Sequence, residues 1–563
     1  MKRIIIALIC IAASVQLNAQ IDPTVEVSRK YEAGIQDMNK PFIPTEVADS
    51  LERFDISFDY SIFNRQYSDL YEFTPYDAAQ LSTVGTKRAP FFYAKIGTQF
   101  PVIPTAEIYL QGGHNKGFYG SLYGNHNSFW GQLHNAVTDE KYDSDRMASN
   151  VGGNLCYAWE EGEFKFDANY NFDRYNYSNV GCKDMHSNNY LNISANLSSA
   201  RAEDNSVYYD ITALFRKTNK TLAVDNSSNS LLAERFGVGS ISENFLSFKG
   251  NVGATFDIHR IYINMNIEYA AYSKTHDFSS GIVELSPIYQ LERNRLNAKV
   301  GVKFGSKYTI SGKEIDTDVE SEALSNFFPD IDLRYSLIPK TLWVHLVAGG
   351  GNDLNPFAKL LRDCPVLVPS VNAVSGKRTL DSRLALEGLL FGKLSLSAFG
   401  AYVIHEDHLL YRPERILDNS FRMDTEYRDF NQFSVGAEIF LKTEDLSIEG
   451  AIKYNSYRDS SGTGVKELPQ VEGKASARYN FRERIIAQFD LGFRSSVEYD
   501  DPFFASVCKV PAILDMDFNL NFIINKNVSV FGKVGNILDK RNQYMPLYVE
   551  PGRNFGGGVC VTF

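Results

Sequence analysis

Apolar and polar residues alternate along most of the chain from about residue 90 to the C-terminus. The segment IIAQFDLGFR, residues 485–494, has apolar side chains at every second position and mostly polar ones between them. The same alternation occurs at residues 164–172, 261–269 and 514–522. Because successive side chains of a strand point to opposite faces, each of these segments predicts a β-strand with one apolar and one polar face.

Strand length and loop length distinguish a membrane barrel from a soluble sandwich. The alternating segments suggest strands of about 10 to 14 residues, which suits a tilted bilayer crossing. Short and long connections also alternate, as in barrels with tight periplasmic turns and long extracellular loops. Short turns are expected at 161–162, 257–260, 305–307, 339–340, 392–393, 444–445, 482–484 and 525–527, and long polar segments at 131–146, 221–243, 352–378, 412–431, 459–472, 498–511 and 539–552.

The expected fold is therefore all-β: an antiparallel transmembrane β-barrel over residues 90–563, with about 22 strands, short periplasmic turns and long extracellular loops. A soluble β-sandwich is the alternative, but it does not account for the regular alternation of loop lengths. The wall is expected to turn its apolar face to lipid and its polar face to the lumen.

The N-terminus reads as an export signal. Lys2 and Arg3 precede an apolar run, and Leu17-Asn18-Ala19 forms a small-residue cleavage site, so residues 1–19 are predicted to be a signal peptide. The mature chain would begin near Gln20 and be exported to the outer membrane of a Gram-negative cell. Residues 20–89 are predicted to form an N-terminal periplasmic or lumen-docking segment.

Composition narrows the function classes. With 57 Lys and Arg against 68 Asp and Glu, the net charge of −11 excludes a general nucleic-acid binder. The 39 Phe and 32 Tyr suit a β protein whose apolar residues are spread thinly along strands. A disulfide among Cys182, Cys364 and Cys508 is one interpretation of the cysteines, and unpaired thiols are the other.

The C-terminal thirty residues carry a recognisable motif. It consists of GNILDKR at 535–541, Tyr544, PGR at 551–553, Gly558 and the terminal Phe563. Together these residues resemble the C-terminal signature of TonB-dependent outer-membrane receptors, and 22 strands is the barrel size that this resemblance implies. The aromatic C-terminus, Phe563, resembles the signal read by outer-membrane barrel-assembly machinery.

The resemblance covers only the barrel portion. The family carries an N-terminal plug domain inside its barrel, whereas only 70 residues, 20–89, lie between the signal peptide and the predicted first strand. A barrel of this size encloses a lumen too wide for wall side chains to fill. The lumen is therefore expected to be filled or capped by the N-terminal segment, by infolded long loops, or by a partner protein.

Two groups of residues are candidate sites. Thr24, Val25 and Val27 lie just after the cleavage site and vaguely resemble the box through which such receptors pair with TonB, the alternative being a plain extended tail. The second group is predicted to line the lumen, either as a solute path or by hydrating the lumen and holding whatever fills it: Asp490, Arg494, Asp515 and Asp517.

No metal, cofactor or catalytic site is predicted. His405 and His408 are three apart and would face opposite sides of a regular strand, which favours a polar rim over a metal site. Two functions remain open: solute transport across the outer membrane, or a plug-less scaffold subunit of a complex for protein assembly or export. The expected partners are outer-membrane lipid and lipopolysaccharide, the assembly machinery, a protein in the lumen and TonB, but no nucleic acid and no enzymatic substrate.

Overall fold

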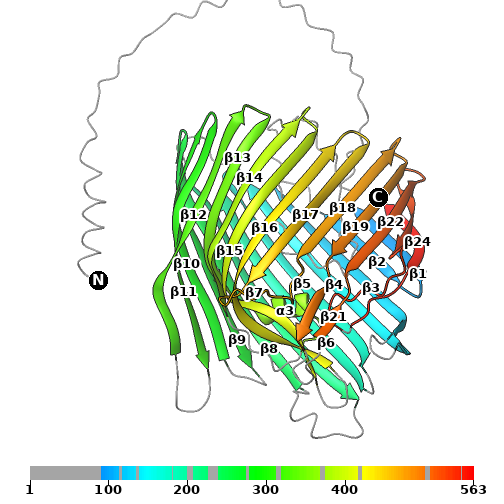
Figure 1. The fold of residues 1–563 in the computed structure, drawn as a ribbon. Helices are drawn as coiled ribbons and strands as arrows, with labels where there is room; N and C mark the ends of the chain where they lie inside the picture. The colour runs from blue at the N-terminus through cyan, green and yellow to red at the C-terminus, as the bar shows by residue number, and fades with distance from the viewer. Residues whose placement is uncertain are drawn as a thin grey trace, which may run out of the picture. The chain divides into compact units, whose positions relative to one another are not determined.

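The computed structural model describes residues 91–112, 117–134, 139–179, 182–199, 207–225, 239–273, 278–311, 319–367, 375–415, 421–500, 507–546 and 548–563. Within these residues, 22 antiparallel strands form one sheet, and the last strand pairs with the first to close it into a barrel (Figure 1). The first eleven strands are β1 (Phe92–Phe100), β2 (Thr105–Gly112), β3 (Phe118–His134), β4 (Lys141–Trp159), β5 (Gly162–Asn179), β6 (Cys182–Ser199), β7 (Val207–Asp225), β8 (Gly239–Phe256), β9 (His259–Ser273), β10 (Phe278–Arg293) and β11 (Leu296–Ser311).

The second half of the barrel contains the only helix of the described residues, α3 (Phe357–Asp363), and a separate two-stranded hairpin, β20 (Val497–Asp500) with β21 (Val507–Val510). The remaining strands are β12 (Val319–Ile338), β13 (Leu342–Asp353), β14 (Gly376–Leu390), β15 (Leu394–Arg415), β16 (Phe421–Lys442), β17 (Leu446–Arg458), β18 (Val471–Phe481), β19 (Ile485–Arg494), β22 (Ile513–Ile523), β23 (Val528–Gly535) and β24 (Asn554–Thr562). The predicted fold class is confirmed.

The alternation sets which way each wall residue points. Large apolar side chains at every second position remain exposed on the outer face, including Leu122, Val151, Ile261, Leu384 and Ile452. Their neighbours along the strands face the lumen and are largely polar. This arrangement is that of a barrel whose outer face contacts acyl chains.

Several strands are longer than predicted. β15 and β16 each have 22 residues, and β4 and β7 each have 19. Consequently, most of the segments 131–146 and 412–431 and both ends of 221–243 are strand, and residues 135–140, 226–238 and 416–420 connect the pairs. The strands continue beyond the length needed to cross a bilayer because each residue added to a pair hydrogen-bonds its backbone N–H and C=O groups to the neighbouring strand.

One predicted turn is wrong. Residues 305–307 lie inside β11, at a shift in register between Gly305 and Lys307 where β11 pairs with β12. The turn between β10 and β11 is instead formed by Asn294 and Arg295, and Asn294 has a positive φ of 41°. Asparagine tolerates this left-handed conformation, so it can close a two-residue hairpin where the sequence has no glycine.

Contacts at the seam join the two ends of the barrel. The N–H of Phe92 donates to the carbonyl of Phe563 at 3.1 Å, and the N–H of Phe563 donates back to Phe92 at 2.9 Å. The ring centroids of these two residues are 6.3 Å apart. The C-terminal residue therefore takes part in closing the sheet.

No helix among the described residues is long and apolar enough to span a membrane. The predicted signal peptide, the segment 20–89 and the TonB-box-like residues lie outside the described residues and remain predictions.

Candidate functional site

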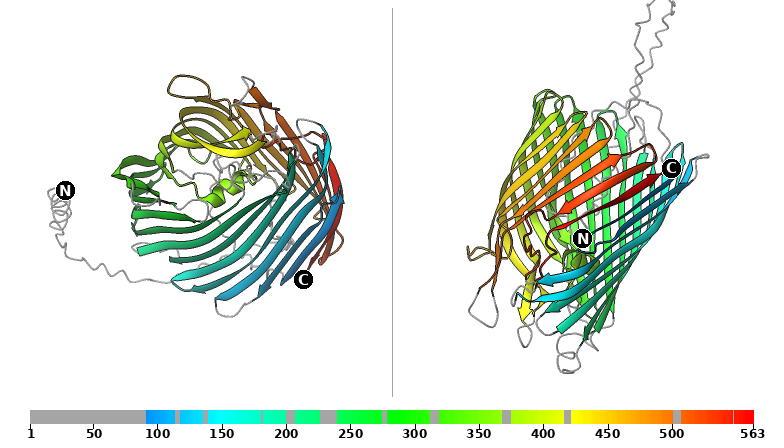
Figure 2. Two further views of the ribbon diagram at one scale, coloured as in Figure 1. Left: turned by 90° about the horizontal axis from the view of Figure 1, so that it is seen from below. Right: turned by 90° about the vertical axis from the view of Figure 1, so that its right-hand side faces the viewer.

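The connection between β13 and β14 carries a short helix into the lumen. Leu354, Phe357, Leu360 and Leu361 follow the spacing of one helical face, and Pro356 precedes the first turn, where its missing N–H costs nothing. All four apolar side chains are buried. Seen along the barrel, α3 lies inside the ring of strands (Figure 2). The prediction that 352–378 is a polar external loop is therefore wrong for its first half.

We call the buried apolar cluster around α3 the loop core. It joins residues of two long connections to lumen-facing residues of β8, β9, β10 and β16. Its members are Ile241, Phe245, Ala270, Tyr272, Ile282, Leu354, Phe357, Leu360, Leu361, Cys364, Val366, Leu367, Met423, Met545 and Tyr548. Six of the side chains that the α3 connection contributes are nearly inaccessible to solvent, which corresponds to roughly 10 kcal/mol of burial as an upper estimate.

Buried polar side chains of the wall fix the α3 connection in place. Glu243 on β8 is fully buried and accepts the backbone N–H groups of Phe357 and Ala358. The carboxylate thereby satisfies two of the N–H groups that the first turn of a helix leaves without partners.

A second buried contact holds the end of the same connection. The Nζ of Lys220 on β7 donates to the carbonyl of Pro365 at 2.8 Å and lies 2.9 Å from Nδ1 of His186 on β6. The Nδ2 of Asn188 reaches the same carbonyl at 3.4 Å. Polar groups of the wall strands thus hold the α3 connection at both ends and fix its position in the lumen.

The connection between β23 and β24 also folds inward and packs against the loop core. Arg146 on β4 is buried, its Nη1 lies 2.5 Å from Oε2 of Glu550, and its Nη2 donates to the carbonyl of Val549 at 3.1 Å. Met545 and Tyr548 of this connection enter the loop core. Two infolded connections therefore pack together inside the lumen, and infolded long loops are one of the three arrangements expected from the sequence.

Three of the four predicted lumen-wall residues contact this second connection. Arg494 donates to the carbonyls of Gln543, at 3.1 Å, and Tyr544. Asp515 lies 3.5 Å from the Tyr544 hydroxyl, and Asp517 accepts the N–H of Asn536 at 2.9 Å. Asp490 instead accepts hydrogen bonds from Ser476 and Gln488 on the wall itself.

The C-terminal motif builds the turn that sends this connection inward. The Asn536 side chain accepts the N–H of Lys540 at 3.0 Å and donates to its carbonyl at 2.7 Å. Asp539 accepts the N–H of Arg553 at 2.7 Å. Asn536 and Asp539 both have positive φ, which suits asparagine and aspartate at turns.

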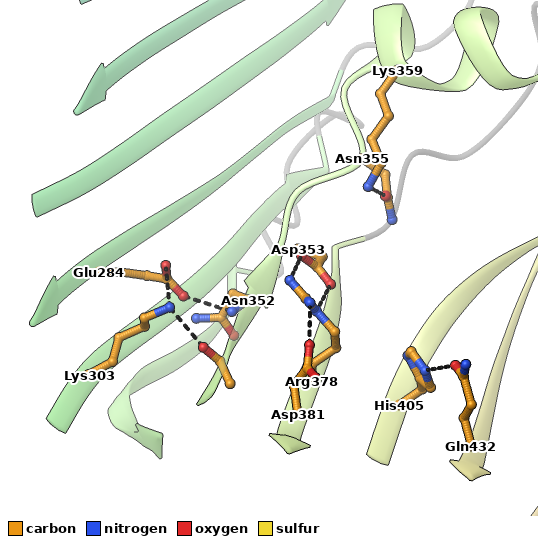
Figure 3. Close-up of polar contacts among 11 residues, drawn as sticks. Glu284, Lys303, Asn352, Asp353, Asn355, Lys359, Arg378, Asp381, His405 and Gln432 are labelled. Atoms are coloured by element: carbon orange, nitrogen blue, oxygen red, sulfur yellow. Dashed lines mark hydrogen bonds and ion pairs between the residues drawn. The ribbon is translucent and has the colours of Figure 1, made fainter. Parts of the chain in front are cut away.

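A polar network lies where β13 leaves the wall toward α3 (Figure 3). Glu284 accepts the N–H of Asn352 at 2.7 Å, and Lys303 donates to the carbonyl of Gly350 at 2.8 Å.

The Arg378 guanidinium binds Asp353 through two nitrogens, at 2.8 and 3.1 Å, and Asp381 at 2.8 Å. These contacts fix the point from which the chain turns inward.

His405 and His408 point the same way, contrary to the expectation from strand periodicity. The register of β15 with β16 shifts between them, and Asp407 has a φ of 50°. This irregularity brings the two ring centroids to 4.3 Å, against Phe430. Among the described residues, no group of three or more His, Cys, Asp or Glu is placed to hold a metal ion.

At the extracellular rim, Asp139 ties two connections together. Its carboxylate pairs with Arg541 of the β23–β24 connection, and Nδ1 of His134 lies 3.2 Å from it. The hydrogen bond from Arg541 holds the pKa of Asp139 below its usual range.

Known structures share the architecture of this barrel. The copper transporter OprC matches with a TM-score of 0.63 and 11% identity, over 85% of this chain and 84% of its own. The FrpB iron transporter from Neisseria meningitidis matches with a TM-score of 0.65 and 9% identity, over 85% and 82%. The siderophore receptor PirA from Acinetobacter baumannii gives 0.62 and 10%, over 85% and 81%.

The barrel has the fold of a TonB-dependent outer-membrane receptor. The likeness confirms the fold that the C-terminal motif implied. Together with the apolar outer face, it agrees with a location in the outer membrane. No protein-family model and no curated protein matches the sequence.

Sequence reasoning missed Glu243, Lys220 and Arg146, the buried charges that hold the infolded connections. Each occupies a lumen-facing position and looks like any other polar wall residue in the alternating pattern. One signal was available: the apolar spacing of Leu354, Phe357 and Leu361 is helical and does not suit an external polar loop.

Proposed function

We propose that the protein is a solute transporter of the outer membrane in which the loop core is the gate. The support is the arrangement of the lumen: a polar wall runs beneath a closure made of two connections, and buried side chains of the wall hold both connections in place. The fold is shared with proteins described as copper and iron transporters.

The size of the loop core indicates how such a gate would behave. Opening such a gate would expose the buried side chains of the α3 connection to water, which opposes spontaneous opening, so that the resting barrel would conduct little. Passage of a solute then requires a trigger or an energy source. A TonB-box-like segment at Thr24, Val25 and Val27 would supply one, and this assignment belongs to the proposal.

Uptake by cells tests the transport function. Depletion of small solutes from the medium is compared for cells with the wild-type protein, without it, and with residues 22–27 deleted. We expect at least one solute to be taken up more slowly in both altered strains. Equal depletion of every solute with and without the protein contradicts transport.

The alternative, a scaffold subunit, is favoured by the same buried apolar loop core, because a permanent seal suits a barrel that transports nothing. It predicts that other outer-membrane proteins co-purify with the full chain in mild detergent at fixed stoichiometry. A protein that purifies alone and alters solute uptake excludes this alternative.

A further inference from the structure

Below the loop core, toward the short turns, the lumen face of β3 to β7 is rich in carboxamides. Tyr190 of β6 packs against the loop core. Asn192 and Asn196 follow it along β6 toward the end of the barrel where the β4–β5 turn lies. On β5, Asp167, Asn169 and Asn171 precede Tyr175, which also packs against the core. These side chains therefore line the lumen on the periplasmic side of the closure.

The carboxamides form a continuous hydrogen-bonded network across four strands. Asn150 of β4 donates to Asn171, which donates to Asn169 at 2.9 Å, and Asn169 donates to Asp167 at 2.8 Å. From β6, Asn192 also donates to Asn169 at 2.8 Å. Arg216 of β7 donates to Asn192 at 2.6 Å. Each amide is thus held in one orientation, as preorganised recognition requires.

A tyrosine ring lies across this network. The hydroxyl of Tyr123 on β3 donates to Asp167 on β5 at 3.3 Å, so the phenol crosses the intervening β4. It passes over Gly152, where an added Cβ would come within 2.6 Å of the hydroxyl and 2.7 Å of Cζ. Because Gly152 has no side chain, the ring lies along the wall instead of standing out from it. Tyr123 is only partly buried, so part of the ring remains accessible from the lumen.

The chemistry of this patch selects a class of ligand. Carboxamides offer donors and acceptors side by side, as do adjacent hydroxyl groups, and an aromatic face accepts apolar C–H groups. The charged side chains bonded to this patch are Asp167, Asp210 and Arg216, so the patch has no excess positive charge that would favour an anionic ligand. A pyranose ring, with its hydroxyl rim and apolar C–H face, presents the matching groups.

We infer that the lumen wall around Tyr123, Asn169 and Asn192 binds a neutral polyhydroxylated solute of the saccharide class. The inference names the substrate class of the proposed transporter and rests on that proposal. A wall that is merely hydrated has the same polarity but no dependence on the aromatic ring, and this difference separates the two interpretations.

Binding to the purified full-length protein in detergent tests the inference without requiring transport. The probes are four neutral trisaccharides (maltotriose, cellotriose, chitotriose and mannotriose), with trigalacturonic acid as the charged counterpart, measured by titration calorimetry. We expect at least one neutral trisaccharide to bind and trigalacturonic acid to bind at least about tenfold more weakly. If no neutral probe binds, or if the charged one binds best, the inference is wrong.

Four variants then locate the site. Tyr123→Ala and Asn169→Leu should each weaken binding about tenfold, whereas Tyr123→Phe, which keeps the ring, should stay within about threefold of the wild type. Gly152→Val should also weaken binding, because it displaces the ring without removing a hydrogen-bonding group. The matched control, Asn519→Ala on the lumen face of β22, should bind normally.

Barrel assembly is checked for each variant by heat-modifiable gel migration. Unchanged affinity in an assembled Tyr123→Ala barrel contradicts the inference. Saccharide binding without any uptake phenotype leaves the site in place and contradicts transport instead.

Discussion

The carboxylate of Glu243, on the barrel wall, accepts the backbone N–H of Phe357 at the start of α3, 114 residues later in the chain. Thr218 donates to the same carboxylate at 3.3 Å, and Glu243 is fully buried. A buried carboxylate that receives several hydrogen bonds cannot be removed without leaving those donors unsatisfied. The position of α3 therefore depends on a side chain of the wall.

Replacing Glu243 by alanine should loosen the loop core. Each N–H group left unsatisfied costs about 1–3 kcal/mol, so we expect at least tenfold more frequent channel openings in planar bilayers. Glu243→Gln, which keeps an acceptor, should open less often than Glu243→Ala. The control is Glu449→Ala, an exposed carboxylate on β17. If Glu243→Ala opens no more often than the wild type, Glu243 does not hold α3 in place.

Breaking the pair between Arg146 and Glu550 should release the β23–β24 connection. Arg146→Ala removes a buried cation that also binds the Val549 carbonyl, and loss of one partner of a buried pair is strongly destabilising. We expect proteinase K to cleave within 539–552 on intact cells at least about tenfold faster. The exchanged pair, Arg146→Glu with Glu550→Arg, should recover part of the protection. Equal cleavage rates in all three proteins would show that the connection is held elsewhere.

The contact between Asp139 and Arg541 should depend on pH in a defined direction. Because the pKa of Asp139 is lowered in the folded protein, the contact is fully present above the ordinary aspartate pKa of about 4 and is lost as the pH falls through the lower folded value. At neutral pH, Asp139→Asn reproduces the protonated state. We expect trypsin to cleave after Arg541 faster in Asp139→Asn than in the wild type. Asp143→Asn in β4 serves as the control. Identical cleavage rates for the two variants would show that the contact between Asp139 and Arg541 does not protect this site.

Deleting Phe563 should impair assembly of the barrel. The residue exchanges two backbone hydrogen bonds with Phe92 at the seam and is the proposed assembly signal. We expect a severalfold loss of heat-modifiable barrel in the outer membrane, whereas Phe563→Tyr, which keeps an aromatic C-terminus, should assemble normally. Normal amounts of assembled barrel after the deletion would contradict both roles.

The sequence predicted the strands well where alternation is strict. The predicted segment 485–494 coincides with β19, and 514–522 lies within β22. It failed where a local irregularity changes the facing of residues, as at Gly305 in β11 and between His405 and His408 in β15. A register shift results from the pairing of two strands, so the alternation read along one strand does not by itself locate it.

The sequence by itself determined that the chain forms a barrel and, where the alternation is unbroken, which face of a strand turns outward, because the two-residue period is a local property. Only the tertiary structure decided that two connections fold inward, that Glu243 and Arg146 hold them, and that Tyr123 crosses Gly152 to reach Asp167. The contacts of Glu243 and Arg146 join residues more than 100 positions apart. These contacts form only when the closed sheet brings complementary groups together, and the pattern of residues along one strand does not show which groups will be neighbours.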